Sequence, residues 1–261
     1  MLKSKRAQVS IFIIIAVLIF GGIALFFVFS KQTIPETTQK SEENPENFLE
    51  SCIEDKVKNA INEISFRGGY PDNKLSINFK FEEDEKYYNI SYLCYSQRNY
   101  VRCLNQKPGF TEDIKKEVKK YISEGVEGCF NEMNSDFIEK GYETNTNYKD
   151  FEVEIIPKRV IVLTDSKLSL KKSGETSKQE DFIIEVASRL YEISFIVHEI
   201  VNQETRFCYA EDLGIMMVYP EFLIDKFKTE DSTTIYTVEH KDSKEKFRFA
   251  IRGCAIPPGM K

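Results

Sequence analysis

The hydrophobic pattern begins with an uninterrupted apolar run over residues 11–29. It holds 19 residues without a charge or a strongly polar group, and 15 of them are Ile, Leu, Phe or Val. As an α-helix the run would be about 28 Å long, close to the hydrocarbon thickness of a bilayer. It therefore predicts a transmembrane helix from Ile11 to Phe29, with the lipid bilayer as its partner. A buried core helix and a cleaved secretory signal are the alternatives. The run lacks the polar face of the first and the small-residue end of the second.

Charges beside this run predict its orientation. Three basic residues and no acidic one precede it, whereas two lysines and four glutamates follow it up to residue 46. The positive-inside rule then places residues 1–10 in the cytoplasm. Residues 30–46 are polar and contain two prolines, which predicts a linker. We expect a single-pass protein of the cell membrane whose main domain, residues 47–261, is extracytoplasmic.

Three later segments carry apolar residues at helical spacing, namely residues 47–66, 111–139 and 189–205. The glycines and proline of Arg67–Pro71 end the first, and Gly141 ends the second. The second helix also contains Gly125 and Gly128, each of which weakens a helix by about 1 kcal/mol relative to alanine. Close approach of another element would explain both glycines.

Strand-like alternation or short apolar runs occupy most of the remaining chain. The predicted strands are residues 74–82 and 86–95 as a hairpin, 150–157, 159–171, 181–187, 213–219, and 232–240 with 245–252 as a final hairpin. This order predicts an α+β fold, with antiparallel sheets packed against three amphipathic helices. The domain is either one unit or two subdomains, residues 47–141 and 150–261, with the boundary near 142–149.

Six cysteines lie beyond the apolar run, and an even number outside the cell favours disulfides. Six cysteines allow 15 pairings, so spacing alone does not select one. Cys52 and Cys129 both lie on apolar helix stripes and would bond if those helices pack together. Cys94 and Cys103 bracket a short loop that a bond between them would close. Cys208 and Cys254 flank the last predicted unit and are the third expected pair. Six reduced cysteines used as small core residues remain the alternative.

The charge balance and the absence of known motifs narrow the function classes. Residues 31–261 carry 33 basic and 42 acidic residues, which argues against a nucleic-acid partner. His198-Glu199 opens like the zinc-protease H-E-x-x-H motif, but Asn202 stands at the position of the second histidine. His240 ends a predicted strand without an obvious partner. We expect no cofactor, no metal site and no enzymatic activity, although a glycosidase pair of carboxylates need not be close in sequence.

Two further features suggest surface chemistry. Five tyrosines gather within a short stretch, either as a binding surface for sugar or protein or as half-buried strand residues: Tyr87, Tyr88, Tyr92, Tyr95 and Tyr100. Asn89-Ile90-Ser91 is the one N-x-S/T sequon, a candidate glycosylation site on an outer surface.

The junction KRAQVSIF, Lys5 to Phe12, resembles the class III signal of archaeal type IV pilins. The resemblance implies cleavage by a prepilin peptidase between Ala7 and Gln8. It departs from the pilin pattern at Phe12, where pilins carry a glutamate used in filament assembly. An ordinary uncleaved signal-anchor is the alternative. The plan also resembles single-pass surface proteins of archaea, with an Ala7–Phe12 start and a first helix that runs from Cys52 into Gly-Gly-Tyr70. That family implies no activity.

The sequence thus predicts a membrane-anchored cell-surface binding or structural module, with other envelope proteins or glycans as partners. A pilin-like subunit and an extracytoplasmic hydrolase are the alternatives.

Overall fold

The computed structural model describes residues 44–256, which belong to one compact unit. The predictions that concern Ala7, Gln8, the Ile11–Phe29 helix and most of the 30–46 linker lie outside these residues. Among residues 44–256, no helix is long and apolar enough to cross a bilayer. Four helices are present in this part of the chain: α2 (Pro45–Ser65), α3 (Phe110–Glu139), α4 (Leu190–Phe207) and α5 (Asp212–Val218).

Helix α2 begins two residues earlier than its hydrophobic pattern indicates. The side chain of Asn44 accepts a hydrogen bond from the N–H of Glu46 at 3.0 Å, and Pro45 occupies the first helical position. Both features favour a helix start, because the cap satisfies a free N–H and proline needs none. The predicted linker therefore ends before Pro45.

The described strands form two sheets. The first has the order β1-β2-β10-β9-β8, with the short β3 also paired to β2. In the second, β4, β6 and β7 all pair with β5. The strand bounds are β1 (Ser76–Phe79), β2 (Tyr88–Tyr95), β3 (Leu104–Asn105), β4 (Glu143–Ile156), β5 (Arg159–Lys172), β6 (Glu175–Glu180), β7 (Ile183–Ala187), β8 (Phe222–Lys228), β9 (Thr234–His240) and β10 (Lys246–Arg252).

One strand pair joins the two ends of the described chain. All strand pairs are antiparallel as predicted, except that β10 lies parallel to β2. The N-terminal and C-terminal hairpins therefore share one sheet, whereas the two-subdomain alternative would place them in different units. Residues 142–149, the predicted boundary, lie mostly within β4, where Glu143–Tyr148 pair with β5. Their polar composition suggests a loop, but alternate side chains are half-buried, which is sufficient for a strand.

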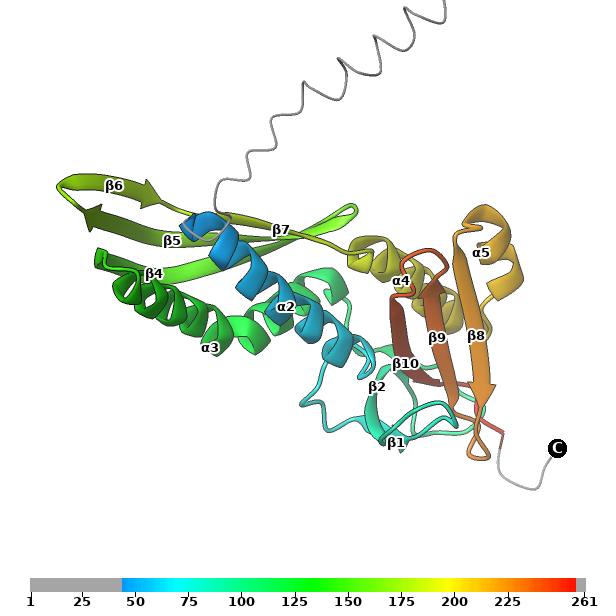
Figure 1. Ribbon diagram of the computed structural model, residues 1–261. Helices are drawn as coiled ribbons and strands as arrows, with labels where there is room; N and C mark the ends of the chain where they lie inside the picture. The colour runs from blue at the N-terminus through cyan, green and yellow to red at the C-terminus, as the bar shows by residue number, and fades with distance from the viewer. Residues whose placement is uncertain (1–43, 257–261) are drawn as a thin grey trace, which may run out of the picture. The chain divides into compact units, whose positions relative to one another are not determined.

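Each sheet is covered by helices on one face (Figure 1). Helices α2 and α3 contact each other and lie along the second sheet, on the side of β7 and β4. Helix α4 packs on the first sheet against β9, β2 and β10. The main core runs continuously through both layers, and a smaller cluster on the other face of the first sheet consists of Ile90, Tyr92, Ile235 and Ala250.

Three disulfides cross-link the fold, and their pairing is the one that the cysteine positions suggested. Cys52–Cys129 joins α2 to α3. Cys94–Cys103 closes the loop between β2 and β3. Cys208–Cys254 ties the end of α4 to the segment after β10. No described cysteine is free.

The prediction of a strand at residues 213–219 is wrong, because most of these residues belong to helix α5. A short apolar run fits either structure by pattern alone. Here Ile215 is buried, and the sulfur of Met216 accepts the N–H of Ile224 at 3.3 Å, so the helix covers the free edge of β8. Strands β3, β6 and β8 were not predicted. β6 is almost entirely polar and is held by backbone pairing to β5.

The glycines of α3 behave differently from one another. A Cβ on Gly125 would meet the side chain of Lys56, on α2, at 3.2 Å, so close packing explains this glycine. A Cβ on Gly128 would meet nothing within 4 Å, so close packing does not explain the second. Gly141 has φ +82° and ends the helix as predicted.

Candidate binding groove

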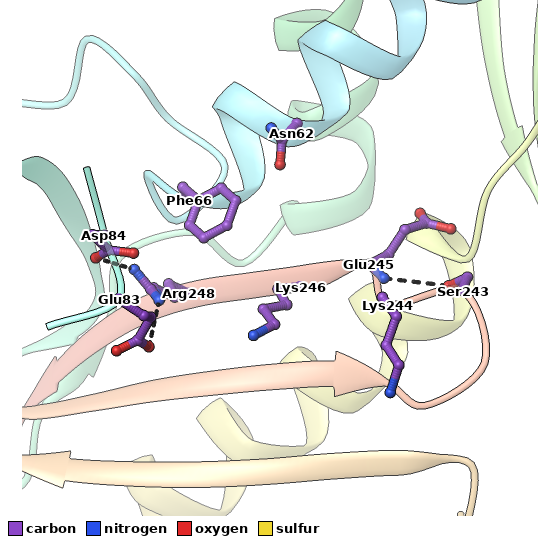
Figure 2. Close-up of a pocket in the computed structure, with 9 residues that line it drawn as sticks. All are labelled: Asn62, Phe66, Glu83, Asp84, Ser243, Lys244, Glu245, Lys246 and Arg248. Atoms are coloured by element: carbon purple, nitrogen blue, oxygen red, sulfur yellow. Dashed lines mark hydrogen bonds and ion pairs between the residues drawn. The ribbon is translucent and has the colours of Figure 1, made fainter. Parts of the chain in front are cut away.

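A groove lies between the C-terminal half of α2 and the turn that joins β9 to β10 (Figure 2). Its larger part has a volume of about 400 Å³ and adjoins a second cavity of about 290 Å³. The two share Asn62, Ser243, Glu245 and Lys246. The residues that line this groove come from elements far apart in the sequence, so no single sequence motif predicts it.

Arg248 lines one end of the groove and is 1% exposed. Its Nη1 lies 2.5 Å from Asp84 Oδ2, and its Nη2 lies 3.4 Å from Glu83 Oε1. The rings of Phe66 and Phe81 lie 4.9 and 4.4 Å from the guanidinium carbon. The Nε atom is buried without a hydrogen-bond partner in the described structure. The guanidinium thus contacts two aromatic rings and two carboxylates of the domain itself, which makes it part of the internal packing.

Glu245 lines both parts of the groove and caps helix α4. Its two carboxylate oxygens accept hydrogen bonds from the N–H of Arg189 at 2.9 and 3.0 Å, and one also accepts the hydroxyl of Ser188 at 2.6 Å. The N-cap residue of α4, Arg189, makes no capping hydrogen bond with its own side chain. A glutamate from a distant turn therefore satisfies the positive end of the helix.

Three lysines line the groove. Lys58 pairs with Glu54 at 2.5 Å, and the other two share one carboxylate. Lys244 and Lys246 lie 3.3 and 3.2 Å from the oxygens of Glu239. Burial raises the pKa of the Glu239 carboxyl, but the hydrogen bonds and charges of Lys246 and Lys244 outweigh this and hold the pKa below its usual value. These lysines, Arg248 and Glu245 therefore each have a partner. Among the described residues, the groove offers space and surface but no charged group placed as a nucleophile or general base.

The two histidines differ in burial. His198 is exposed on α4. His240 is buried and does have a partner, since its Nδ1 accepts the N–H of Ser243 at 3.1 Å. No local sequence pattern indicates that contact, because Ser243 lies three residues further on, across the turn. Within residues 44–256, no group of three His, Cys, Asp or Glu side chains is arranged to hold a metal ion.

A buried polar cluster that the sequence did not indicate joins α4, α5 and the first sheet. The hydroxyl of Tyr236 donates to the carboxylate of Glu204, and the ammonium of Lys226 contacts Asp212 and the carbonyl of Ala210. Burial raises the pKa of Glu204, and the hydrogen bond from Tyr236 offsets this only in part. Burial, with the nearby Glu204 charge, also raises the pKa of Tyr236.

The five tyrosines do not form one surface. Tyr87 and Tyr100 are exposed, Tyr88 stacks on Phe66, and Tyr92 and Tyr95 pack against each other. Tyr88, Tyr92 and Tyr95 are therefore half-buried or buried strand residues, and not part of a common binding surface.

Asn89 is exposed on β2, and its side-chain oxygen accepts a hydrogen bond from Asn78 at 2.7 Å. The hydroxyl of Ser91, the third residue of the sequon, is buried and donates to the carbonyl of Tyr70. Glycosylation of Asn89 remains a prediction. In the folded domain, the hydroxyl of the sequon serine is already hydrogen-bonded to the Tyr70 carbonyl.

Comparison with protein-family models, with curated proteins and with solved structures finds no match for this chain. Its function is therefore argued from its own residues.

Proposed function

We propose that this protein is a membrane-anchored extracytoplasmic protein, held by the apolar run at residues 11–29, whose folded domain is a cell-surface binding or structural module. The observation that carries the proposal is that all six cysteines are paired in three disulfides. Disulfides of this kind persist in oxidising compartments and are rare in the cytosol. This agrees with the orientation expected from the charges beside the apolar run.

The groove supports binding better than catalysis. Its volume of about 400 Å³ falls within the range of small-ligand sites. Arg248 and Glu245 are committed to the fold, which disfavours the hydrolase alternative. Short segments of envelope proteins or glycans are the expected partners.

Thiol labelling and protease access test the anchoring and the orientation. In intact cells an added protease should digest the domain from outside, and a membrane-impermeant maleimide should label the purified full chain only after reduction. A protected domain with six thiols that react without reductant would contradict the proposal.

Capture of envelope components by the full chain tests the binding role. Asn62 is exposed and lines both parts of the groove, so Asn62→Phe should fill it and reduce retention of a partner. The matched control is Asn131→Phe, an exposed position on α3 that does not line the groove. Equal retention by both variants would remove the groove from the binding role.

A pilin-like subunit is the second candidate, because Lys5–Phe12 resembles a class III signal. N-terminal sequencing of the mature protein distinguishes the two. A chain that begins at Gln8 would support processing, and an intact Met1 would exclude it.

A further inference from the structure

Exposed apolar side chains gather on α5. Leu213, Met217 and Val218 are 65, 84 and 68% exposed, which is high for such residues on a short helix. Leu213 and Met217 are four positions apart and so share one face. The inward contacts of α5 come instead from Ile215 and Met216. The three outer side chains are thus not required for docking α5 on the domain.

This surface continues onto α4. Phe195 is 53% exposed, and its ring packs edge-on against Tyr219, with centroids 5.7 Å apart. Tyr219 directly follows Val218, and Tyr191 lies one helical turn before Phe195. We refer to Tyr191, Phe195, Leu213, Met217, Val218 and Tyr219 as the α4–α5 apolar surface. Single exposed apolar residues are ordinary, whereas several that gather on neighbouring elements are typical of an interaction site.

We propose that the α4–α5 apolar surface rests on the outer face of the bilayer to which the chain is anchored; this inference depends on the anchoring proposed above. The apolar run ends at Phe29 and the described structure begins at Asn44, which leaves 14 residues between them. Fully extended, 14 residues span at most about 50 Å. A domain of this length has a radius of gyration of about 17 Å. The connection therefore keeps the whole domain within reach of the lipid surface.

The form of the surface favours lipid over a protein partner. Helix α5 stands outside the edge strand β8 (Figure 1), and its apolar side chains Leu213, Met217 and Val218 are mostly exposed. Projecting Leu, Met, Val and Phe side chains enter the boundary between head groups and acyl chains without needing a matched shape. Tyrosine beside them suits the same boundary. The acid in the first turn of α5, Asp212, is neutralised by Lys226.

The chain contains no tryptophan, so Met217→Trp places a single indole on the surface. The full chain is reconstituted into phosphatidylcholine vesicles whose acyl chains carry bromine near the head groups. We expect blue-shifted indole emission and at least two-fold quenching relative to unbrominated vesicles. Lys178→Trp, exposed on β6 of the other sheet, is the matched control and should show neither change. Val218→Trp is a second reporter if Met217→Trp disturbs the fold.

Flotation of the same vesicles separates this inference from the anchoring on which it depends. A chain that floats but shows unquenched, water-exposed emission at both reporters would overturn the lipid contact and leave the anchor intact. Blue-shifted emission without bromine quenching would also overturn it, since the surface would then be buried against protein, such as a second copy of the chain. A chain that does not float would overturn both.

Discussion

Cys52 of α2 and Cys129 of α3 are joined by a disulfide, with their Cα atoms 5.9 Å apart although they lie 77 positions apart in the sequence. The helices on either side bury apolar side chains against each other, so the bond lies in an already complementary interface.

Removal of this disulfide should destabilise the domain strongly. The entropy of closing a loop over a separation of 77 residues corresponds to about 4.5 kcal/mol, against about 2.5 kcal/mol for the nine-residue separation of Cys94 and Cys103. We expect Cys52→Ala/Cys129→Ala to lower the free energy of unfolding more than Cys94→Ala/Cys103→Ala. Urea unfolding with a comparison of midpoints measures this. The opposite order would show that loop entropy does not govern these bonds.

The Gly-Gly turn after α2 should be intolerant of side chains. Gly69 has φ +85°, and a Cβ there would meet Ile114 at 3.3 Å and Phe247 at 3.4 Å. We expect Gly69→Ala to cost about 2 kcal/mol or more, because the backbone cost adds to crowding in the core. Gly174→Ala is the matched control, with φ +87° and nothing within 4 Å. Thermal unfolding of both variants measures the difference, and equal losses would mean that crowding contributes nothing.

The Arg248–Asp84 pair should show strong coupling. Arg248→Met leaves the Asp84 carboxylate, whose side chain is 7% exposed, without its cation. Loss of one partner of a buried pair costs about 3–5 kcal/mol. Asp84→Asn combined with Arg248→Met should recover part of that loss. A double-mutant cycle by urea unfolding gives the coupling energy, and additive losses would argue that the two side chains act independently.

Glu204 should make stability fall as the pH rises. Burial raises its folded-state pKa above the ordinary value of 4.5, so the folded state holds the proton more tightly than the unfolded state. The contribution is full below pH 4.5 and is lost as the pH rises through the higher folded pKa. Glu204→Gln should therefore gain stability relative to the native chain as the pH increases.

Urea unfolding between about pH 4 and 8 measures this difference, with the exposed Glu221→Gln as control. Groups with lowered pKa values, such as Asp150 and Glu239, give the opposite slope at lower pH in every variant. Parallel curves for the native chain and Glu204→Gln would contradict the assignment.

Local pattern determined most of the elements. The α+β class, the three long helices and the hairpins β1–β2 and β9–β10 follow from periodicities of 3.6 and 2, since a buried face imposes its spacing on the sequence. The same patterns placed Cys52 and Cys129 on apolar helix stripes, and the packing of α2 on α3 brings those stripes together. The transmembrane helix predicted for residues 11–29 likewise depends on the sequence alone.

Only tertiary structure decided the rest. The run at 213–219 became a helix because a partner, the edge of β8, was available for Met216. The polar strand β6 exists because β5 extends far enough to pair with it. The groove, the cap on α4 by Glu245 and the burial of Arg248 each join residues more than fifty positions apart. Such contacts leave no local periodicity, because their energy depends on which elements the parallel β2–β10 pairing brings together.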